Sequence, residues 1–294
     1  MTTVQISAKM VAELRARTGA GMMDCKKALE EAGGDMEQAI DVLRKKGVAK
    51  ADKRAGRAAS EGQIVAQVSA DGRVGVLVEV NSETDFVGRN DEFKALARSM
   101  AGQVSQDAAV DGVVTVGADG AYLGSVWSQG GGTVGDVVKA ASAKTGENVV
   151  LRRIARFTSS GAVGSYLHHN GKVGVLVELQ GVSGVAAATV AKSIAEHVAA
   201  GVPTVAVAVD KDGVPADLVA RERAIFEEQA RASGKPANIV EKMVSGRIDK
   251  YFAEVTLLNQ PWVRDDAKTI RQVLADAGSG ATIARFARFQ MGEE

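Results

Sequence analysis

An internal repeat constrains the fold of this chain more than any other feature of its sequence. Residues 71–80, DGRVGVLVEV, return as residues 170–179, NGKVGVLVEL, at an offset of 99 positions. In each copy an Asp-Gly or Asn-Gly turn precedes an apolar run, a pattern typical of a β-hairpin. A match of this length predicts that the same hairpin is built twice.

The repeat continues beyond the hairpins. Three further segments of the first copy, residues 99–104, 133–138 and 153–157, resemble residues 193–198, 269–274 and 285–289. Each copy therefore predicts a β-hairpin, a helix, an intervening segment, a second helix and a closing strand. Short antiparallel strands with helices on one face make an α+β fold, here with core subdomain 1 in residues 58–159 and core subdomain 2 in residues 160–294.

Two additions distinguish the copies. The offset falls from 99 to 94 after the hairpin, so the first copy holds five more residues, in the segment that contains Thr84 and Gly88. Farther on, positions 103 and 133 lie 30 apart in the first copy, whereas positions 197 and 269 lie 72 apart in the second, which is 42 more. Function is commonly grafted onto a scaffold at such additions.

The first addition places a large apolar side chain among polar ones. Residues 80–91, VNSETDFVGRND, follow an apolar run and precede a helical pattern, so they predict a loop at the end of a strand. Phe86 has Asp85 before it and Gly88, Arg89 and Asn90 soon after it, and these neighbours cannot bury its ring. Either the ring is tucked into the protein's own core, or it is offered to another molecule.

The second addition predicts an antiparallel helical hairpin over residues 215–256. Its apolar positions are Leu218, Ile225 and Phe226 on the first helix, and Val240, Val244, Tyr251 and Val255 on the second. Residues 233–236, SGKP, supply the reversal, with Gly ending one helix and Pro opening the next. Such a hairpin can pair with a second copy, giving a homodimer, or with a partner, and its two apolar stripes can equally satisfy each other.

The N-terminal residues 1–57 predict a three-helix domain and a basic connector. The inward positions expected for the three helices are Val11 and Leu14, then Met22, Cys25, Leu29 and Ala32, then Met36, Ala39, Ile40 and Leu43. A bundle this small is more typical of an adaptor than of a catalyst. The connector, residues 44–57, holds seven Lys or Arg against one Asp. It is either an RNA-binding strip or a solvated helical link, and the lack of interleaved aromatic residues favours the link.

Composition excludes several function classes. A net charge of zero argues against nucleic acid as the main partner, and a single cysteine excludes an intramolecular disulfide framework and fits a reducing compartment. The N-terminus lacks a signal-peptide pattern and no run is long enough to span a membrane, so we expect a cytoplasmic protein. The three histidines, His168, His169 and His197, lack the spacing of metal ligands, and Cys25 has no histidine in its bundle. We therefore expect no metal site, no cofactor and no enzyme activity.

Three motifs, in their order along the chain, identify a family. Residues 18–29, TGAGMMDCKKAL, residues 81–87, NSETDFV, and residues 234–247, which open with GKP and end with EKMVSGR, together resemble translation elongation factor Ts. The resemblance implies a guanine-nucleotide exchange factor for the GTPase elongation factor Tu, without catalytic chemistry of its own. It also implies a ubiquitin-associated-like three-helix domain, a core of two duplicated α/β subdomains with small antiparallel sheets, and a coiled-coil module inserted in the second subdomain.

The same resemblance implies where the partner is contacted. Thr84, Asp85, Phe86 and Val87 would lie at the partner's Mg²⁺ site, where the Phe86 ring would wedge between helices and displace the elements that hold the metal's waters. Further contacts are implied for Arg15, Met22 and Met23 in the bundle and for Thr145, Gly146 and His168 in the core. Because Met22 falls on the predicted inward stripe, we expect Met23 to be the outward contact of the pair.

Overall fold

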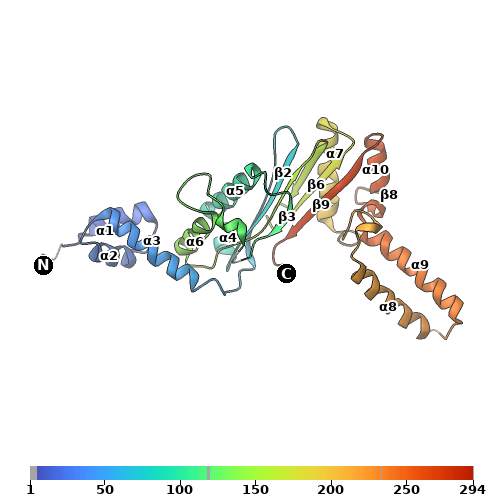
Figure 1. Ribbon diagram of the computed structural model, residues 1–294, viewed down its shortest axis with the longest axis horizontal. Helices are drawn as coiled ribbons and strands as arrows, with labels where there is room; N and C mark the ends of the chain where they lie inside the picture. Colours follow the sequence, from blue (N-terminus) through green and yellow to red (C-terminus); the bar gives the residue numbers. More distant parts are fainter. Residues whose placement is uncertain (1–4, 118–119, 233, 294) are drawn as a thin grey trace.

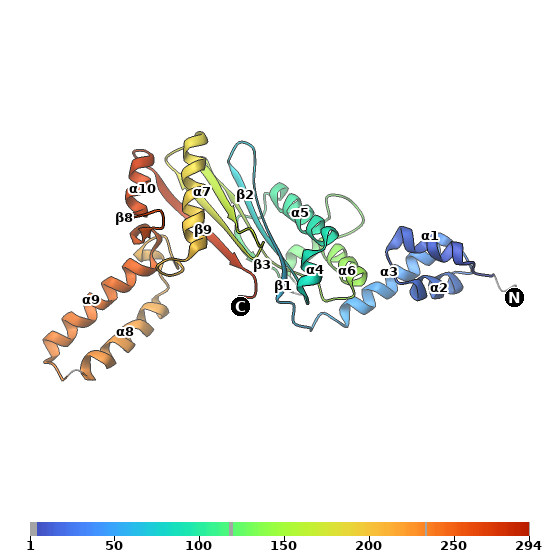
Figure 2. The same ribbon diagram turned by 180° about the vertical axis from the view of Figure 1, so that it is seen from behind.

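The computed structural model describes residues 5–117, 120–232 and 234–293. The first four residues, Ser233 of the predicted reversal and Glu294 lie outside this part. Three bodies follow one another along an extended molecule: an N-terminal helical bundle, a mixed core and a projecting pair of helices (Figure 1). Figure 2 gives the same arrangement from behind, with the bundle and the helix pair at opposite ends of the core.

The N-terminal bundle consists of α1 (Ala8–Thr18), α2 (Met22–Glu31) and α3 (Met36–Asp52). The hydroxyl of Ser7 caps α1 by accepting the amide of Met10, and the carboxylate of Asp35 caps α3 in the same way. The buried core includes Leu14, Cys25 and Leu29. The third helix continues into the predicted connector and packs against α6 (Val134–Thr145) of the core. A Cβ added at Gly47 would lie only 2.9 Å from the Cβ of Ala143, so the two helices approach closely there.

One prediction for the bundle is wrong. Met22 was placed on the inward stripe of α2, but its side chain is 56% exposed, and that of Met23 is 64% exposed. Met22 is the first residue of α2, and it precedes the layer in which the helix meets its neighbours. That layer begins at Cys25 and repeats with helical spacing at Ala28 and Leu29.

The core is built on two main antiparallel sheets, as the repeat predicted. The first has the order β1 (Glu61–Val68), β2 (Val74–Ser82), β4 (Val150–Thr158), β3 (Gly112–Thr115), and the second has the order β5 (Ala162–Leu167), β6 (Val173–Gln180), β9 (Thr282–Gln290). A shift of register occurs between Glu79 and Val80 in β2 and again between Glu178 and Leu179 in β6. The two copies therefore share the order of three strands and also this irregularity, and the first copy adds β3 at the edge of its sheet.

The two sheets lie face to face between helices. Alternate residues of β2, Val76, Val78 and Val80, face a cluster with α5 (Asp91–Gln106) and α6, whereas the β6 residues Val175, Val177 and Leu179 face α7 (Gly184–Ala200) and α10 (Ile270–Ala277). The opposite faces of the sheets meet in a shared cluster that includes Leu77 and Leu176. Both faces of these central strands are thus covered, which explains their continuous apolar runs.

Glycine permits the close approach of the two sheets. A Cβ added at Gly75 would lie 2.4 Å from Cγ1 of Val163 in the other sheet. At the equivalent repeat position, a Cβ added at Gly174 would lie 2.6 Å from side-chain atoms of both Ile64 and Leu77. Any larger residue at these positions would push the sheets apart.

Each copy contains one ion pair to a buried glutamate, and the arginine of each pair also contacts the other copy. Arg153 of β4 pairs with the fully buried Glu79, and its guanidinium lies 4.4 Å from the ring centre of Phe289 in β9. Arg285 of β9 pairs with Glu178 at 2.7 Å, and its guanidinium lies 4.4 Å from the ring centre of Phe157 in β4. Each arginine stacks on the phenylalanine of the other copy, so the duplicated sequence also produces reciprocal contacts in space.

The larger addition forms the antiparallel pair α8 (Ala216–Ala232) and α9 (Ala237–Val255). Phe226 of α8 packs against the cluster of α9 residues that includes Val244 and Ile248. Ile225 was predicted to face the same side, but it is exposed, because the contact stripe runs through Val219 and Phe226 instead. The apolar stripes of the two helices therefore satisfy each other.

Short elements complete the connections. They are η1 (Ala121–Gly124), η2 (Lys211–Gly213), η3 (Leu257–Asn259), β7 (Pro261–Trp262) and β8 (Asp265–Thr269). None of the helices in the described ranges combines the length and apolar character that crossing a bilayer requires.

Candidate functional site

The five residues added to the first copy form a single-turn helix, α4 (Asp85–Arg89). It stands between the end of β2 and the start of α5, where the second copy passes from β6 to α7 without a helix. Thr84 begins the turn, since its Oγ1 accepts the amide of Val87 at 3.4 Å. Asn90 separates α4 from α5, and its Oδ1 accepts the amide of Glu92 at 2.8 Å.

The side chain of Phe86 points away from the protein. It is 84% exposed, so of the two interpretations left open by the sequence, the one in which the ring is presented outward is correct. Its neighbours in the same turn pack the helix against the rest of the core. Val87 packs against the core cluster of the first copy, and a Cβ added at Gly88 would lie 2.9 Å from the carbonyl oxygen of Gly62 in β1. One face of α4 is therefore anchored while the other presents an aromatic ring.

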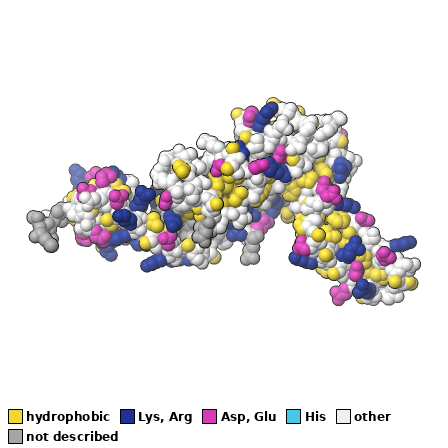
Figure 3. Space-filling view, in the orientation of Figure 1, with side chains coloured by type: hydrophobic (Ala, Val, Ile, Leu, Met, Phe, Trp, Pro, Cys, Tyr) yellow, Lys and Arg dark blue, Asp and Glu magenta, His cyan; other side chains and the backbone are white. Residues whose placement is uncertain are grey.

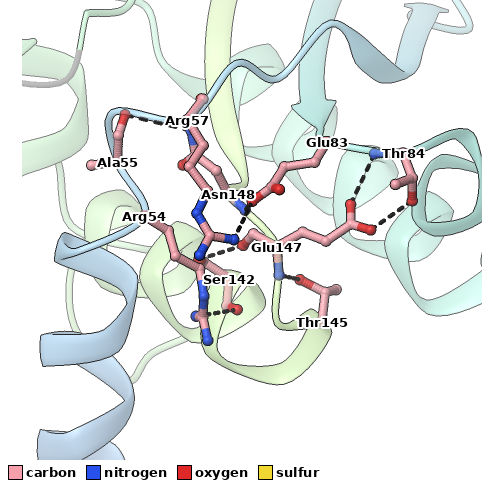
Figure 4. Close-up of polar contacts among 9 residues, drawn as sticks. All are labelled: Arg54, Ala55, Arg57, Glu83, Thr84, Ser142, Thr145, Glu147 and Asn148. Atoms are coloured by element: carbon pink, nitrogen blue, oxygen red, sulfur yellow. Dashed lines mark hydrogen bonds and ion pairs between the residues drawn. The ribbon is translucent and has the colours of Figure 1, made fainter.

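Two carboxylates tie the start of α4 to the loop that follows α6 (Figure 4). We call this loop, residues 145–148, the clamp loop. The carboxylate of Glu147 accepts two hydrogen bonds from Thr84, one from the backbone amide at 3.0 Å and one from the side-chain hydroxyl at 2.6 Å. In return, the carboxylate of Glu83 accepts the amide of Asn148 at 2.6 Å. The two segments thus hold each other through charge-assisted hydrogen bonds in both directions.

The clamp loop contains two of the predicted contact residues. Thr145 ends α6, and its hydroxyl donates to the carbonyl of Ala141 and accepts the amide of Glu147. Gly146 follows with a φ of 78°, a left-handed conformation that suits glycine, and it is exposed. The structure therefore brings Thr145 and Gly146 beside the start of α4.

His168 lies in the turn between β5 and β6. That turn approaches β1, because the carbonyl of Gly171 accepts the amide of Ile64 at 3.0 Å, and a Cβ at Gly171 would lie 2.7 Å from Oε1 of Gln63. The same Gln63 donates through Nε2 to the carbonyl of Gly88 at 2.9 Å. His168 is half-buried, and its ring lies 4.1 Å from that of His169. Gln63 thus connects the His168 turn with α4.

The remaining predicted contacts lie on the N-terminal bundle. Arg15 on α1 and both Met22 and Met23 on α2 are exposed. They form a second surface, which α3 links to the core through its packing on α6. The candidate residues therefore fall into two groups, one around α4 and one on the bundle.

Several basic side chains of the connector are held by partners within the chain. Lys46 pairs with Glu31, Lys50 with Asp24 and Arg57 with Glu83, while Arg54 donates to the carbonyl of Ser142. On the face in Figure 3, basic and acidic side chains intermingle over the bundle. This arrangement favours the interpretation of residues 44–57 as a structural link.

Sequence reasoning missed Glu83, Glu147, Asn148 and Gln63. Each acts through a tertiary contact that no local pattern marks. One signal was present in the repeat: at the positions equivalent to Glu83 and Glu147 the second copy has Val182 and Ser279. Charged residues that occur only in the copy with the added helix could have been associated with it.

The site is organised for binding. Across the described ranges, no three His, Cys, Asp or Glu side chains are placed together as metal ligands. The histidine with a shifted pKa, His197, lies in the second copy, where burial lowers its pKa and its ring bonds to Gln260. What α4 offers instead is an exposed ring on a supported turn, the kind of feature that acts as an anchor in protein interfaces.

Comparison with known proteins identifies the family. A family model described as Elongation factor TS matches residues 83–293 of this chain. The chain belongs to the elongation factor Ts family. Elongation factor Ts of Methylococcus capsulatus is 47% identical over 291 residues, covering 99% of this chain and 93% of that relative. Elongation factor Ts of Thioalkalivibrio sulfidiphilus is 48% identical over 292 residues, covering 98% and 92%. The α4 turn, the clamp loop and the α8–α9 pair all lie within the part matched by the elongation factor Ts model.

Proposed function

We propose that this chain is a guanine-nucleotide exchange factor for elongation factor Tu and releases GDP by inserting Phe86 beside the partner's Mg²⁺ site. The observation that carries the proposal is an exposed aromatic ring on an added turn whose opposite face is fixed to the core. Membership of the elongation factor Ts family supports the choice of partner.

The mechanism is a linkage between two ligands of the GTPase. When a GTPase binds GDP with nanomolar affinity, the binding free energy that the exchange factor must offset is about 12 kcal/mol. The factor does so by binding the nucleotide-free state more tightly than the nucleotide-bound state, and reciprocity then requires that nucleotide weakens binding of the factor. A single buried aromatic contributes a few kcal/mol, so other contacts must contribute the rest.

The residues around Phe86 have separate roles in this proposal. Thr84 begins the turn, and Val87 fixes it to the core cluster. Asp85 forms an exposed ion pair with Arg89 at 3.0 Å in the free protein. Such an exposed pair is worth little, so Asp85 can exchange Arg89 for donors of the partner. Thr145, Gly146 and His168 would extend the contact beyond α4.

The bundle would provide the second contact. Met22 and Met23 are both exposed, and flexible thioether side chains adapt to an apolar partner surface. Arg15 would add a charged contact on the neighbouring helix. Two separated contacts raise the overall affinity more than either alone, because the second forms within an existing complex.

The direct test is release of fluorescently labelled GDP from purified elongation factor Tu in an excess of unlabelled GDP. Substoichiometric amounts of this protein are expected to accelerate release, and raising free GDP is expected to dissociate the complex of the two proteins. An unchanged release rate at saturating protein would refute the exchange function. The same protein should be titrated with RNA over a range of salt concentrations, because tight, salt-sensitive RNA binding without effect on GDP would instead support the basic connector as the functional element.

A further inference from the structure

We propose that Glu147 is a positioning residue for Phe86, and that the clamp loop holds α4 and the N-terminal connector together so that both proposed contacts keep a fixed geometry. The inference rests on the proposed exchange function, and it assigns a role to Glu147 and Asn148, which are not among the proposed partner contacts. Three independent observations support it.

The first observation is that both oxygens of the Glu147 carboxylate accept hydrogen bonds from Thr84. One bond comes from the amide of Thr84 and the other from its hydroxyl. That same hydroxyl oxygen accepts the amide of Val87, so the carboxylate fixes the residue that begins the α4 turn. Phe86 lies between Thr84 and Val87. The direction of its ring therefore depends on a turn held at its first residue by Glu147.

The second observation comes from comparing the two copies. The second copy has Val182 where the first has Glu83, and Ser279 where the first has Glu147. There the corresponding junction is closed by backbone, since a Cβ at Gly181 would lie 1.9 Å from the carbonyl oxygen of Gly280. The shared scaffold therefore folds without a carboxylate at either place. Reciprocal carboxylates occur only in the copy that carries the added helix.

The third observation is that the clamp loop also holds the connector. The side-chain amide of Asn148 donates to the carbonyl of Arg57 at 2.7 Å and to that of Ala55 at 3.4 Å. Arg57 in turn pairs with Glu83, which accepts the amide of Asn148 (Figure 4). The clamp loop thus fixes two segments at once. One is the start of α4, and the other is the connector that leads to the bundle.

Removal of the Glu147 carboxylate should release the first residue of α4 without unfolding the core. Val87, Gly88 and Gln63 still hold the rest of the turn. The ring would then sample more directions, and fewer encounters would place it correctly. We expect the limiting rate of GDP release at saturating protein to fall about tenfold, comparable to the loss of one hydrogen bond to a charged group. The concentration for half-maximal rate should change much less, because the bundle contacts remain.

The test is a double-mutant cycle in the labelled-GDP assay. Glu147→Ala and Glu147→Gln are measured alone and in combination with Phe86→Ala. Glu147→Gln keeps one acceptor oxygen and should fall between wild type and Glu147→Ala. In the Phe86→Ala background, Glu147→Ala should change the rate less than about twofold, since coupled residues are non-additive. Asp276→Asn is the matched control: it removes a partly exposed carboxylate paired with Lys268 near the end of α10, the second copy's counterpart of α6, and should leave the rate unchanged.

The outcomes separate the two proposals. A normal rate for Phe86→Ala refutes the wedge. Two outcomes refute only the positioning role. In the first, Phe86→Ala slows GDP release while Glu147→Ala releases GDP at the wild-type rate. In the second, Glu147→Ala slows GDP release by the same factor in the wild-type and Phe86→Ala backgrounds. Amide hydrogen exchange gives a second readout on the free protein: residues 85–89 should exchange faster in Glu147→Ala while α5 keeps its protection. Unchanged exchange of those amides also overturns the inference, and if Glu147→Ala fails to fold, Glu147→Gln is judged by the same two measurements.

Discussion

Replacement of Phe86 by alanine separates the stability of this protein from its proposed activity. The ring is 84% exposed in the free chain, so it contributes almost nothing to folding. An aromatic side chain of this kind buries on the order of 200 Å² when fully covered. At about 25 cal/mol per Å², covering the exposed part of the ring is worth at most roughly 4 kcal/mol.

Part of that energy is lost in ordering the ring and in imperfect packing, about 1–2 kcal/mol, which leaves roughly 2–3 kcal/mol. Since each 1.4 kcal/mol is a factor of ten, about a 30- to 150-fold slower GDP release is expected for Phe86→Ala at a fixed concentration of protein. The free energy of unfolding should stay within about 0.5 kcal/mol of wild type, as for other exposed positions.

The assay is stopped-flow release of labelled GDP from elongation factor Tu, with chemical denaturation of each variant alongside. Val185→Ala is the matched control, because Val185 is an apolar side chain that is 86% exposed at the start of α7 in the second copy. It should leave both quantities unchanged. A Phe86→Ala variant that releases GDP at the wild-type rate, or that slows release only as much as Val185→Ala does, would refute the reasoning.

Three further predictions concern the scaffold. Gly75→Ala should lower the free energy of unfolding by about 1–3 kcal/mol in chemical denaturation, because its Cβ would meet Val163 at 2.4 Å. Gly102→Ala in α5 is the control, and because the space around Gly102 is open it should raise the free energy of unfolding by roughly 0.5–1 kcal/mol. A change of the same sign in both variants would contradict the contact between the sheets. Arg153→Met should cost about 2–3 kcal/mol in the free energy of unfolding, because the fully buried Glu79 loses the nearer of its two arginine partners and keeps only Arg152, which is 4.0 Å away; adding Glu79→Gln should recover most of that loss. Burial lowers the pKa of His197 below its usual 6.5, so the stability contributed by its neutral form is complete above pH 6.5 and is lost as the pH falls below it; denaturation curves at several pH values should show this loss in wild type and a smaller one in His197→Gln.

The sequence predicted the elements of the core because the repeat could be compared with itself. The matched decapeptides mark both hairpins, and the drop in offset from 99 to 94 locates the added turn to within a few residues. Neither signal says how the copies meet. The contact of Leu77 with the other sheet depends on tertiary packing, which no local period encodes. The same is true of the contacts that Arg153 and Arg285 make with phenylalanine rings of the other copy.

The errors of prediction have a common physical origin. Met22 has the right spacing for an inward face but precedes the stretch where a neighbouring helix is present, whereas Ile225 lies beside the contact stripe that runs through Val219 and Phe226. Helical periodicity shows which residues share a face, and it does not show where along the helix that face is covered. The clamp loop was missed for a related reason, because Glu147 and Thr84 are 63 positions apart and only the folded chain brings them together.

The position of the added turn follows from the mechanical requirement of a wedge. A side chain that displaces elements of another protein must be supported on the side away from the partner, or it will move instead. α4 meets this requirement because it leaves the end of β2, a central strand covered on both faces, and lies against Gly62 of the adjacent strand. An equally exposed ring on the projecting α8–α9 pair would have only the two helices behind it. The four-layer core therefore explains why an insertion of five residues at this junction can carry the proposed function.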